Sequence, residues 1–472
     1  MKPFALAFDV GTSSVRAGVY TQTGRLIPAS FSQSQHRLHT DSDGTATLEP
    51  QELLRSTQQV GRHAIESCGA QSISTVSMSC FWHSLLALNT HGDAITPILT
   101  WADTRCSSAS AWLREVLDEK ATHHRTGCML RSSFWTAKLA WVRRDQPQWW
   151  QDAALWVGPA EWLLSQMFGV PIRQSVAMAS GTGLYDSWAG VWDQEILETL
   201  ELEPDCIASV SDQAMELTQA GVLARAKLYP AIGDGAASNL GSGASGAGRM
   251  ALNFGTSGAV RLVETNPDRI ATGLFRYKID DRHHLIGGAV SNAGNLHQWL
   301  AENLRLPGDA ELEGIMSQRI RPVPSLHVLP FLVEERAPTW PTGLPGTILG
   351  LKTAHTAVDI YQAAMEAVYQ RLARIAGLIR GSRADIEVMV SGGLSQSAIA
   401  MQRMADVMQL PLSACEEAEA SLRGAAVFAL RQSGVQEEPA AVGAAYEPRL
   451  SYADEYREQG RALERLETWF LD

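Results

Sequence analysis

The sequence predicts an α/β protein with at least two domains, and three observations lead to this prediction. The chain has 472 residues, of which 45% are hydrophobic, so it can bury more than one core. Short apolar runs typical of strands alternate with longer amphipathic stretches typical of helices. The tetrad Gly-Thr-Ser-Ser at 11–14 also has a near-copy, Gly-Thr-Ser-Gly at 255–258, so one half-domain is expected to occur twice.

The first half is expected to combine strands, one long helix and a Trp-rich helical region. The expected elements are strands over 4–10, 16–21 and 26–31, a helix over 50–68 ending at Gly69, a strand–turn–strand unit over 72–89 and helices between 107 and 145. The aromatic residues of the last region have the spacing of core packing rather than of a cofactor site.

A Gly/Ser/Ala-rich stretch over 233–248 is a break in composition, and we expect the domain boundary there. The expected parts are a first domain over 1–247, a second over 248–435 and a helical tail over 436–472. After the second tetrad the chain is expected to form a Pro-rich loop over 322–345, a helix over 357–379, a strand over 386–391, a turn at Gly392-Gly393 and another helix.

Charge and composition exclude several classes of protein. The net charge of −12 argues against a nucleic-acid surface and means that an anionic substrate needs local donors or a metal ion. The six cysteines lack the spacing of a zinc site or a disulfide framework. No apolar run approaches the roughly 18 residues that span a bilayer. The sequence therefore predicts a cytoplasmic protein that binds neither nucleic acid nor membranes.

The two tetrads predict a shared binding site for a polyphosphate. Each tetrad lies between strand-like runs, so each is expected to be a hairpin turn in which backbone N–H groups and hydroxyls converge on one anion. One such turn alone would be an ordinary hairpin turn. Because two copies occur, the residues expected to hold phosphates are Gly11, Thr12, Ser13, Gly255, Thr256 and Ser257.

Neither standard nucleotide motif accounts for such a site. Residues 241–246 satisfy the pattern G-x-G-x-x-G, but no strand with β-branched residues precedes them and no long helix follows. The chain also lacks G-x-x-x-x-G-K-[ST], so ATP would bind without that loop.

Two acids next to these turns are candidates for chemistry. Asp9 ends the first apolar strand, where a buried carboxylate needs a cation or donors, and a hydrated Mg²⁺ is the expected partner. Asp234 lies between two glycines at a helix start, where it could accept a proton from an attacking hydroxyl. The alternatives are that Asp9 caps its own turn and that Asp234 is an N-cap.

Six ordered segments together resemble the FGGY family of carbohydrate kinases, from about Phe4 to Gln432. These segments are FDVGTSSVRA (8–17), GDGAASNLGSG (233–243), NFGTSGAVR (253–261), GGAVSNAGNLHQWL (287–300), PFLVEERAPTWP (330–341) and VMVSGGLSQSAIAMQRMADVMQLPL (388–412). The resemblance implies two actin-like (ribonuclease H-like) domains, each a mixed sheet flanked by helices, with a catalytic cleft between them. It also implies ATP and Mg²⁺, a small-molecule sugar or sugar acid as substrate, and adenosine binding at Gly392, Gly393 and Ser397.

Within that family, the segments HSLLALN (83–89), TWADTR (100–105) and SGTGLYD (180–186) look most like gluconokinases. This resemblance implies phosphorylation of gluconate to 6-phosphogluconate in a pocket formed by Trp82, His83, Trp101, Asp103, Arg105 and Asp234. Arg105 and His83 are expected to supply positive charge or donors for a sugar-acid carboxylate. Glu334 departs from the family, in which glycine is usual at this position.

Several alternatives stay open at this point. The substrate could be another polyol or ketose, such as glycerol or xylulose, and Trp101 and Arg105 could be a core residue and a surface ion-pair partner. An ATP-driven conformational protein, a phosphatase or a sugar sensor could have the same fold. The oligomeric state is also open, with a homodimer as one alternative.

Overall fold

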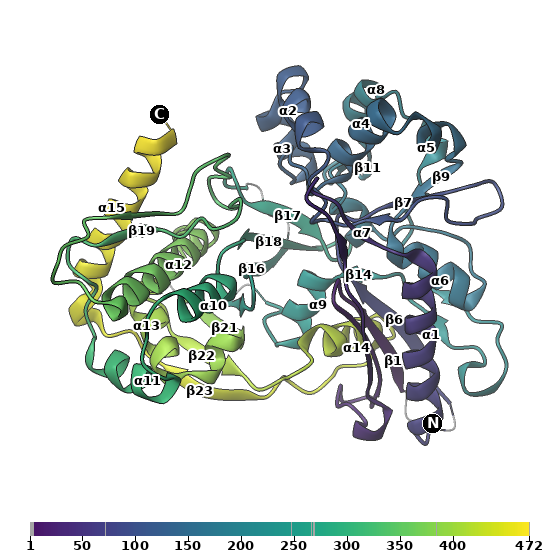
Figure 1. Cartoon of the computed structure of the whole chain (residues 1–472). Helices are drawn as coiled ribbons and strands as arrows, with labels where there is room; N and C mark the ends of the chain where they lie inside the picture. Colours follow the sequence, from purple (N-terminus) through teal and green to yellow (C-terminus); the bar gives the residue numbers. More distant parts are fainter. Residues whose placement is uncertain are drawn as a thin grey trace.

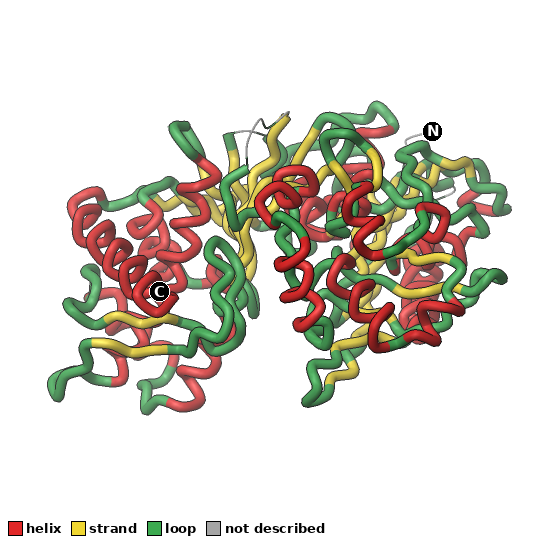
Figure 2. The backbone as a smooth tube through the Cα atoms, turned by 90° about the horizontal axis from the view of Figure 1, so that it is seen from above, coloured by secondary structure: helices red, strands yellow, loops and turns green. Residues whose placement is uncertain are grey.

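The computed structural model describes residues 4–70, 72–246, 248–265, 267, 270–383 and 385–471. The chain forms two bodies side by side, each a mixed sheet flanked by helices (Figures 1 and 2). This two-domain α/β architecture confirms the predicted fold class. Ala247, at the predicted boundary, lies outside the described residues. None of the helices in the described ranges is both long and apolar enough to cross a membrane.

The first sheet is built around the predicted hairpin. β1 (Ala5–Val10) pairs antiparallel with β2 (Ser14–Tyr20) and parallel with β6 (Thr75–Cys80), and all six residues of β1 are buried. The sheet has the order β12-β13-β6-β1-β2-β3, and β14 also pairs with β6. Its other strands are β3 (Ser32–Gln35), β12 (Met215–Glu216), β13 (Lys227–Leu228) and β14 (Ile232–Gly233).

One predicted strand, over residues 26–31, is wrong. Leu26 makes only an isolated bridge to Tyr20, and residues Pro28–Ser30 form a 3₁₀ helix instead. Pro28 has no N–H group and its fixed φ suits the start of a helical turn. The Ser30 hydroxyl oxygen also accepts a hydrogen bond from Val19 N at 2.8 Å.

The helices of the first body follow the predicted regions. The predicted helix over 50–68 is observed as α1 (Pro50–Ser67), and Gly69 follows it with φ of 63°. The Trp-rich region forms several short helices around a core that contains Trp135, Trp141 and Trp156, as its spacing predicts. The other helices are α2 (Ser107–Val116), α3 (Glu119–Thr126), α4 (Trp135–Asp145), α5 (Pro147–Asp152), α6 (Pro159–Phe168), α7 (Val176–Ser180), α8 (Gln194–Leu200) and α9 (Asp234–Gly241). Short strands complete this body, namely β4 (His39–Thr40), β5 (Ala46–Leu48), β7 (Leu86–Leu88), β8 (Ile98–Leu99), β9 (Leu155–Val157), β10 (Tyr185–Asp186) and β11 (Val191–Trp192).

The second body repeats the central arrangement of the first. β15 (Arg249–Phe254) pairs antiparallel with β16 (Gly258–Thr265) and parallel with β21 (Glu387–Gly392), as β1 does with β2 and β6. The sheet has the order β17-β18-β16-β15-β21-β22-β23. Its other strands are β17 (Phe275–Lys278), β18 (His283–Val290), β22 (Leu412–Cys415) and β23 (Val442–Tyr446). The remaining elements are α10 (Gly294–Asn303), α11 (Asp309–Gln318), β19 (His327–Leu329), β20 (Thr347–Leu349), α12 (Ala357–Arg380) and α13 (Ala398–Met408).

Helix α14 (Ala420–Gln432) returns to the first body and packs against α9 and β1 (Figure 1). The crossing of α14 and α9 is close because glycines face the neighbouring backbone. A Cβ at Gly424 would lie 1.8 Å from Ala237 O, and one at Gly241 would lie 1.7 Å from Ala420 O. The end of the predicted second domain thus packs on the first sheet.

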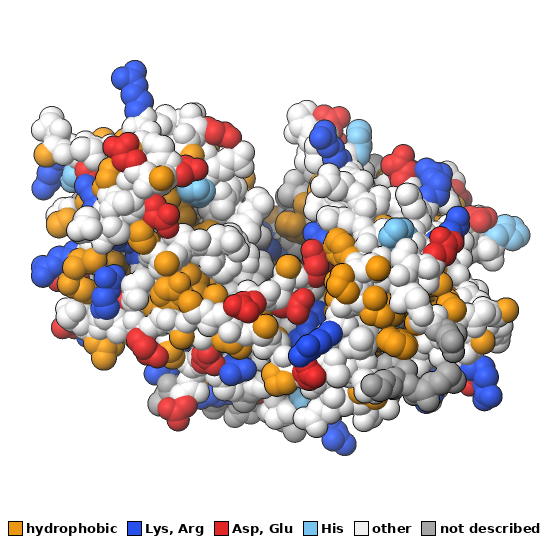
Figure 3. Space-filling model, turned by 90° about the horizontal axis from the view of Figure 1, so that it is seen from below, with side chains coloured by type: hydrophobic (Ala, Val, Ile, Leu, Met, Phe, Trp, Pro, Cys, Tyr) orange, Lys and Arg blue, Asp and Glu red, His pale blue; other side chains and the backbone are white. Residues whose placement is uncertain are grey.

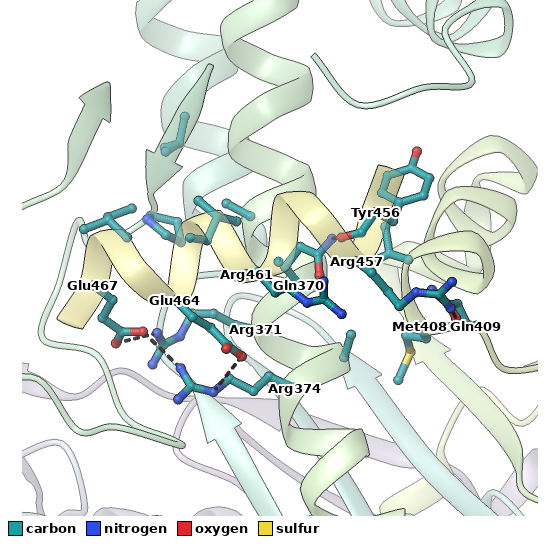
Figure 4. A pocket seen from close by; sticks show the side chains of 18 of the residues that line it. Gln370, Arg371, Arg374, Met408, Gln409, Tyr456, Arg457, Arg461, Glu464 and Glu467 are labelled. Carbon is teal, nitrogen blue, oxygen red and sulfur yellow. Dashed lines mark hydrogen bonds and ion pairs between the residues drawn. The ribbon is translucent and has the colours of Figure 1, made fainter. Parts of the chain in front are cut away.

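The segment expected as a helical tail contains strand β23 as well as helix α15 (Ala453–Leu471). Helix α15 lies across α12 above a cavity of about 320 Å³ and is held there by ion pairs (Figure 4). Arg371 Nη1 lies 2.9 Å from Glu467 Oε1, and Arg374 Nε lies 3.3 Å from Glu464 Oε1.

Candidate active site

A cavity of about 200 Å³ lies where the two bodies meet, and both contribute to its walls. The first body supplies Thr12, Trp82 and Asp234, and the second supplies Ser257, Arg261 and Arg336. The molecular surface is also hollowed between the two bodies (Figure 3). Of the predicted site residues, the cavity therefore brings together Thr12, Trp82, His83, Trp101, Asp234 and Ser257.

Asp234 is the first residue of α9, directly after the short strand β14. Gly233 occupies the N-cap position, so Asp234 is not the N-cap. The flanking glycines give space to two other side chains, because a Cβ at Gly233 would lie 1.9 Å from the Trp82 ring and one at Gly235 would lie 2.9 Å from Arg261 Nε. Burial raises the pKa of Asp234, while Arg261 opposes the shift. A raised pKa suits a carboxylate that accepts a proton.

Asp9 ends strand β1 and is almost fully buried. Its carboxylate accepts hydrogen bonds from Ser79 Oγ at 2.9 Å and from Arg16 Nη1 at 3.1 Å. The hairpin turn is closed separately, since Gly11 N donates to Ser14 O at 2.9 Å. Asp9 therefore does not cap its own turn. Burial raises the pKa of Asp9, and the Ser79 hydrogen bond and Arg16 oppose the shift.

Asp9 is the candidate magnesium ligand of this site. Across the described residues, no group of three or more His, Cys, Asp or Glu side chains is arranged to hold a metal ion. A single carboxylate fits Mg²⁺ only if the ion keeps most of its waters and takes phosphate oxygens as further ligands. Asp9 already pairs with Arg16 at 3.1 Å, so it would reach a magnesium ion only through the ion's waters and not as part of a dedicated protein cage.

The two predicted phosphate turns close differently, since the first is bridged from Gly11 N to Ser14 O and the second is bridged over one residue fewer. Gly255 N donates to Ser257 O at 2.9 Å, and α10 supports this turn through Gly294 N, which donates to Gly255 O at 2.9 Å. Thr12 and Ser257 line the cavity. The hydroxyls of Thr12, Ser13, Thr256 and Ser257 make no hydrogen bond to any other described residue, so they are free to donate to a ligand.

The predicted adenosine site divides into two parts. Gly392 has φ of 90°, and a Cβ there would lie 2.4 Å from Phe254 O, so the turn at Gly392-Gly393 requires glycine. Ser397 caps α13, since its hydroxyl accepts from Ala400 N at 3.2 Å. It also lines a cavity of about 470 Å³ between helices α10 to α13, together with Tyr361 and His297. Gly392 and Gly393 do not line this cavity.

His83 differs from its expected role. Its Nδ1 lies 2.5 Å from Gly181 O, and because a carbonyl can only accept, Nδ1 carries the proton and Nε2 is an acceptor. Burial lowers the pKa of His83 to about 3, so the ring is neutral near pH 7. His83 therefore does not supply the positive charge that the sequence led us to expect.

Asp103 and Arg105 are not among the residues that line the cavity between the two bodies. Arg105 Nη2 donates to Asp103 Oδ2 at 2.6 Å, and its guanidinium lies 4.7 Å from the centroid of the Trp141 ring. The two side chains thus pair with each other. This arrangement matches the ion-pair alternative for Arg105.

Arg261 and Arg336 are two cavity residues that sequence reasoning missed. Both lie in segments that carry the family resemblance, NFGTSGAVR and PFLVEERAPTWP, so their identity was visible. What the sequence does not show is that β16 and the loop after β19 direct both side chains into the cavity. The positive charge expected from Arg105 and His83 is provided by these two arginines.

The fold and this site define a two-domain α/β protein with phosphate-type turns and an acid at one interdomain cavity. Residues 4–226 match the N-terminal domain of the FGGY family of carbohydrate kinases, and residues 250–433 match its C-terminal domain. The chain belongs to the FGGY family of carbohydrate kinases.

Relatives in the family differ in their substrates. The chain is 27% identical to a gluconokinase of Bacillus subtilis, with 92% of this chain and 88% of that protein covered. It is 29% identical to a glycerol kinase of Leptothrix cholodnii, with 99% and 98% covered. Two solved structures from Lactobacillus acidophilus, described as a gluconate kinase and a xylulose kinase, each superimpose with a TM-score of 0.91 at 22% identity, covering 99% of this chain and 98% of theirs. The family is therefore established, while the substrate is not.

Proposed function

We propose that the protein transfers the γ-phosphoryl group of ATP to a hydroxyl of gluconate, giving 6-phosphogluconate. The observation that carries this proposal is the meeting of Asp234 with two phosphate-type turns, through Thr12 and Ser257, at one cavity between the two bodies. A hydroxyl acceptor held against Asp234 would thus face a phosphoryl group held by the turns. Gluconate as the acceptor is supported by the resemblance to gluconokinases.

The chain's residues have defined tasks in this reaction. In phosphoryl transfer the protein mainly positions the reactants and neutralises charge. Asp234 orients the acceptor hydroxyl and takes its proton as the bond to phosphorus forms. The free hydroxyls and backbone N–H groups of the two turns hold the polyphosphate, and the 470 Å³ cavity beside Ser397 has room for the adenosine. Mg²⁺, held through Asp9 and its own waters, would neutralise phosphate charge when bound.

The cavity between the two bodies also suits a polyhydroxy acceptor. Aromatic faces of Trp82 and Tyr277, whose ring centroids are 4.8 Å apart, form one wall. The neutral ring of His83 presents Nε2 as an acceptor for a substrate hydroxyl. Such a mixture of apolar surface with a few placed polar groups is typical of small-molecule sites.

The test is ADP formation with ATP and a panel of acceptors: gluconate, other sugar acids, glycerol, sorbitol and xylulose. Gluconate is expected to give the highest kcat/KM, and phosphorus NMR should place the product phosphate on C6. Asp234→Asn is the matched control, because it should abolish acceptor-dependent turnover with every acceptor. A higher kcat/KM with a neutral polyol or ketose would reject gluconate and leave only the broader carbohydrate-kinase activity. ATP turnover that no acceptor stimulates would instead favour a conformational ATPase.

A further inference from the structure

We propose that Arg261 and Arg336 together bind the carboxylate of the substrate and so restrict this enzyme to sugar acids. This inference rests on the proposed function, because it names the side chains that would select gluconate over a neutral sugar. Both guanidinium groups line the cavity that contains Asp234, and they reach it from different segments of the second body.

The first argument is that neither guanidinium directly contacts a carboxylate. Within the described ranges of the chain, neither guanidinium forms an ion pair with a carboxylate. Two buried arginines of the second body do have one, since Arg371 pairs with Glu467 at 2.9 Å and Arg403 pairs with Glu366 at 2.5 Å. Arg276, which is also buried, instead donates to the oxygens of His124 and Ser187. An enclosed charge is costly unless an opposite charge meets it. Asp234 attracts both guanidinium groups and Glu335 also attracts Arg336, but without direct contact, so a substrate carboxylate would supply the direct partner.

The second argument is that the fold makes space for Arg261. Its stem crosses Gly287 on the neighbouring strand, where a Cβ would lie 3.0 Å from Arg261 Cγ. Its head lies beside Gly235, where a Cβ would lie 2.9 Å from Nε. Side chains at either position would obstruct the arginine. The two glycines therefore leave a path along which the guanidinium reaches the cavity.

The third argument is that hydrogen bonds hold the Arg336 guanidinium in place and leave several of its N–H donors free. Its Nε donates to Ser291 Oγ at 3.1 Å and its Nη2 donates to Val290 O at 3.1 Å. The guanidinium also lies 5.6 Å from the centroid of the Trp101 ring. A guanidinium has five N–H donors, so both hydrogens on Nη1 and one on Nη2 stay available. A planar fork held in this way suits a planar carboxylate.

The fourth argument concerns charge balance. Asp234 is the single acid among the described residues that line this cavity, against two arginines. Burial lowers the pKa of both arginines. At Arg336 the charge of Glu335 opposes this shift and the charge of Arg261 adds to it. The overall charge of −12 would otherwise repel an anionic substrate. Two local cations overcome this repulsion, whereas a neutral ketose would leave one of them without a counterion.

The test compares gluconate with gluconamide, which has the same chain but no charge on C1. Wild-type enzyme is expected to prefer gluconate, both in kcat/KM and in calorimetric affinity measured with a non-hydrolysable ATP analogue. Arg336→Ala and Arg261→Gln should each weaken gluconate binding roughly 10- to 150-fold, the loss expected for a hydrogen bond to a charged group. Gluconamide binding should change less than about threefold. Arg336→Lys keeps the positive charge but loses the planar pair of N–H donors, so its loss of gluconate affinity should lie between these values.

Arg62, which is exposed on α1, provides the matched control, and Arg62→Ala should leave both ligands unaffected. Thermal unfolding of each variant identifies one that has lost its fold, and the Arg261→Lys and Arg336→Lys variants then replace it. Equal losses for gluconate and gluconamide would overturn the inference. So would a loss of ATP affinity with gluconate binding intact, because the arginines would then serve the phosphoryl group. If wild-type enzyme prefers a neutral acceptor, the proposed function itself fails; if it prefers gluconate and the arginine variants do too, only this inference fails.

Discussion

Asp234 places a half-buried carboxylate in a cavity that it shares with both phosphate-type turns. Replacing it with asparagine keeps the shape and the oxygen that accepts from Gly235 N at 2.7 Å, but removes the base. We expect Asp234→Asn to lower kcat by roughly 10²- to 10⁴-fold. ATP affinity, measured by calorimetry, should stay within a few-fold of wild type. A fall in turnover of less than about tenfold with intact ATP binding would show that Asp234 is not the base.

Glu161 is a buried acid outside this cavity, and it makes stability depend on pH. It lies in the first turn of α6, folded back over Gly158, and burial raises its pKa from 4.5 to about 7. Between these two values the folded state keeps a proton that the unfolded state has lost, so stability falls as pH rises through this window. We expect Glu161→Gln to stabilise the protein at pH 8 by an amount on the order of 3 kcal/mol.

This stabilisation should shrink as pH falls and vanish below pH 4.5, because both states of wild-type Glu161 are then protonated. Urea unfolding of both proteins at several pH values measures the difference. The same advantage for Glu161→Gln at pH 4.5 and pH 8 would contradict the titration of Glu161.

At the scale of elements, the two hairpins β1–β2 and β15–β16 each present a turn with free hydroxyls. Thr12→Val and Thr256→Val each remove one free hydroxyl and keep the shape of the side chain. Each variant should lose roughly 1.5–3 kcal/mol of interaction with the nucleotide, which appears as a lower kcat/KM for ATP. Gluconate affinity without nucleotide should hardly change. Unchanged ATP kinetics in one variant would show that its hairpin is only structural.

Helix α15 supports the active-site loop from a distance. Glu467 pairs with Arg371 (Figure 4). Arg371 Nη2 also donates to Ala337 O at 2.8 Å, directly after Arg336. Breaking a buried pair by removing one partner costs about 3–5 kcal/mol. We therefore expect Glu467→Gln to lower the melting temperature and to raise KM for gluconate more than KM for ATP. Glu464→Gln, at a more exposed pair on the same helix, is the control and should show little of either effect.

At the scale of the whole molecule, local sequence patterns predicted most helices and strands. They could not predict which side chains point into the cavity between the two bodies. The hairpins and helix α1 depend on neighbouring residues, so apolar runs, turn residues and Gly69 were sufficient. The strand over 26–31 failed because Pro28 determines the backbone there. Arg105 failed as a cavity residue because its nearest acid, Asp103, is two residues away and pairs with it.

The positive charge of the cavity could not be located from either half of the sequence alone. Arg261 and Arg336 are far from Asp234 in sequence and meet it only when the two bodies come together. A glycine beside an arginine in space, such as Gly235 beside Arg261, leaves no signal in a single sequence. Asp9 and the turns were predicted because each lies at the end of a recognisable strand, and Asp234 was predicted because it lies between two glycines at a helix start.

The contact between the bodies can be tested at Gly127, which ends α3 with φ of 72°. A Cβ there would lie 2.1 Å from Arg276 O on β17, the strand that also brings Phe275 and Tyr277 to the cavity. Gly127→Ala combines the strain of a left-handed residue, about 1–2 kcal/mol, with this clash. We expect a lower melting temperature and a lower kcat/KM for gluconate.

Gly169→Ala is the matched control, because Gly169 ends α6 with φ of 66° and has no atom within 4 Å of its added Cβ. It has the same backbone strain without the clash, so it should lose stability but keep the kinetics of the wild-type enzyme. Kinetics that fall equally in both variants would mean that strain alone accounts for the loss. A lower kcat/KM in Gly127→Ala alone would show that the packing of β17 against α3 keeps the two halves of the active site correctly positioned.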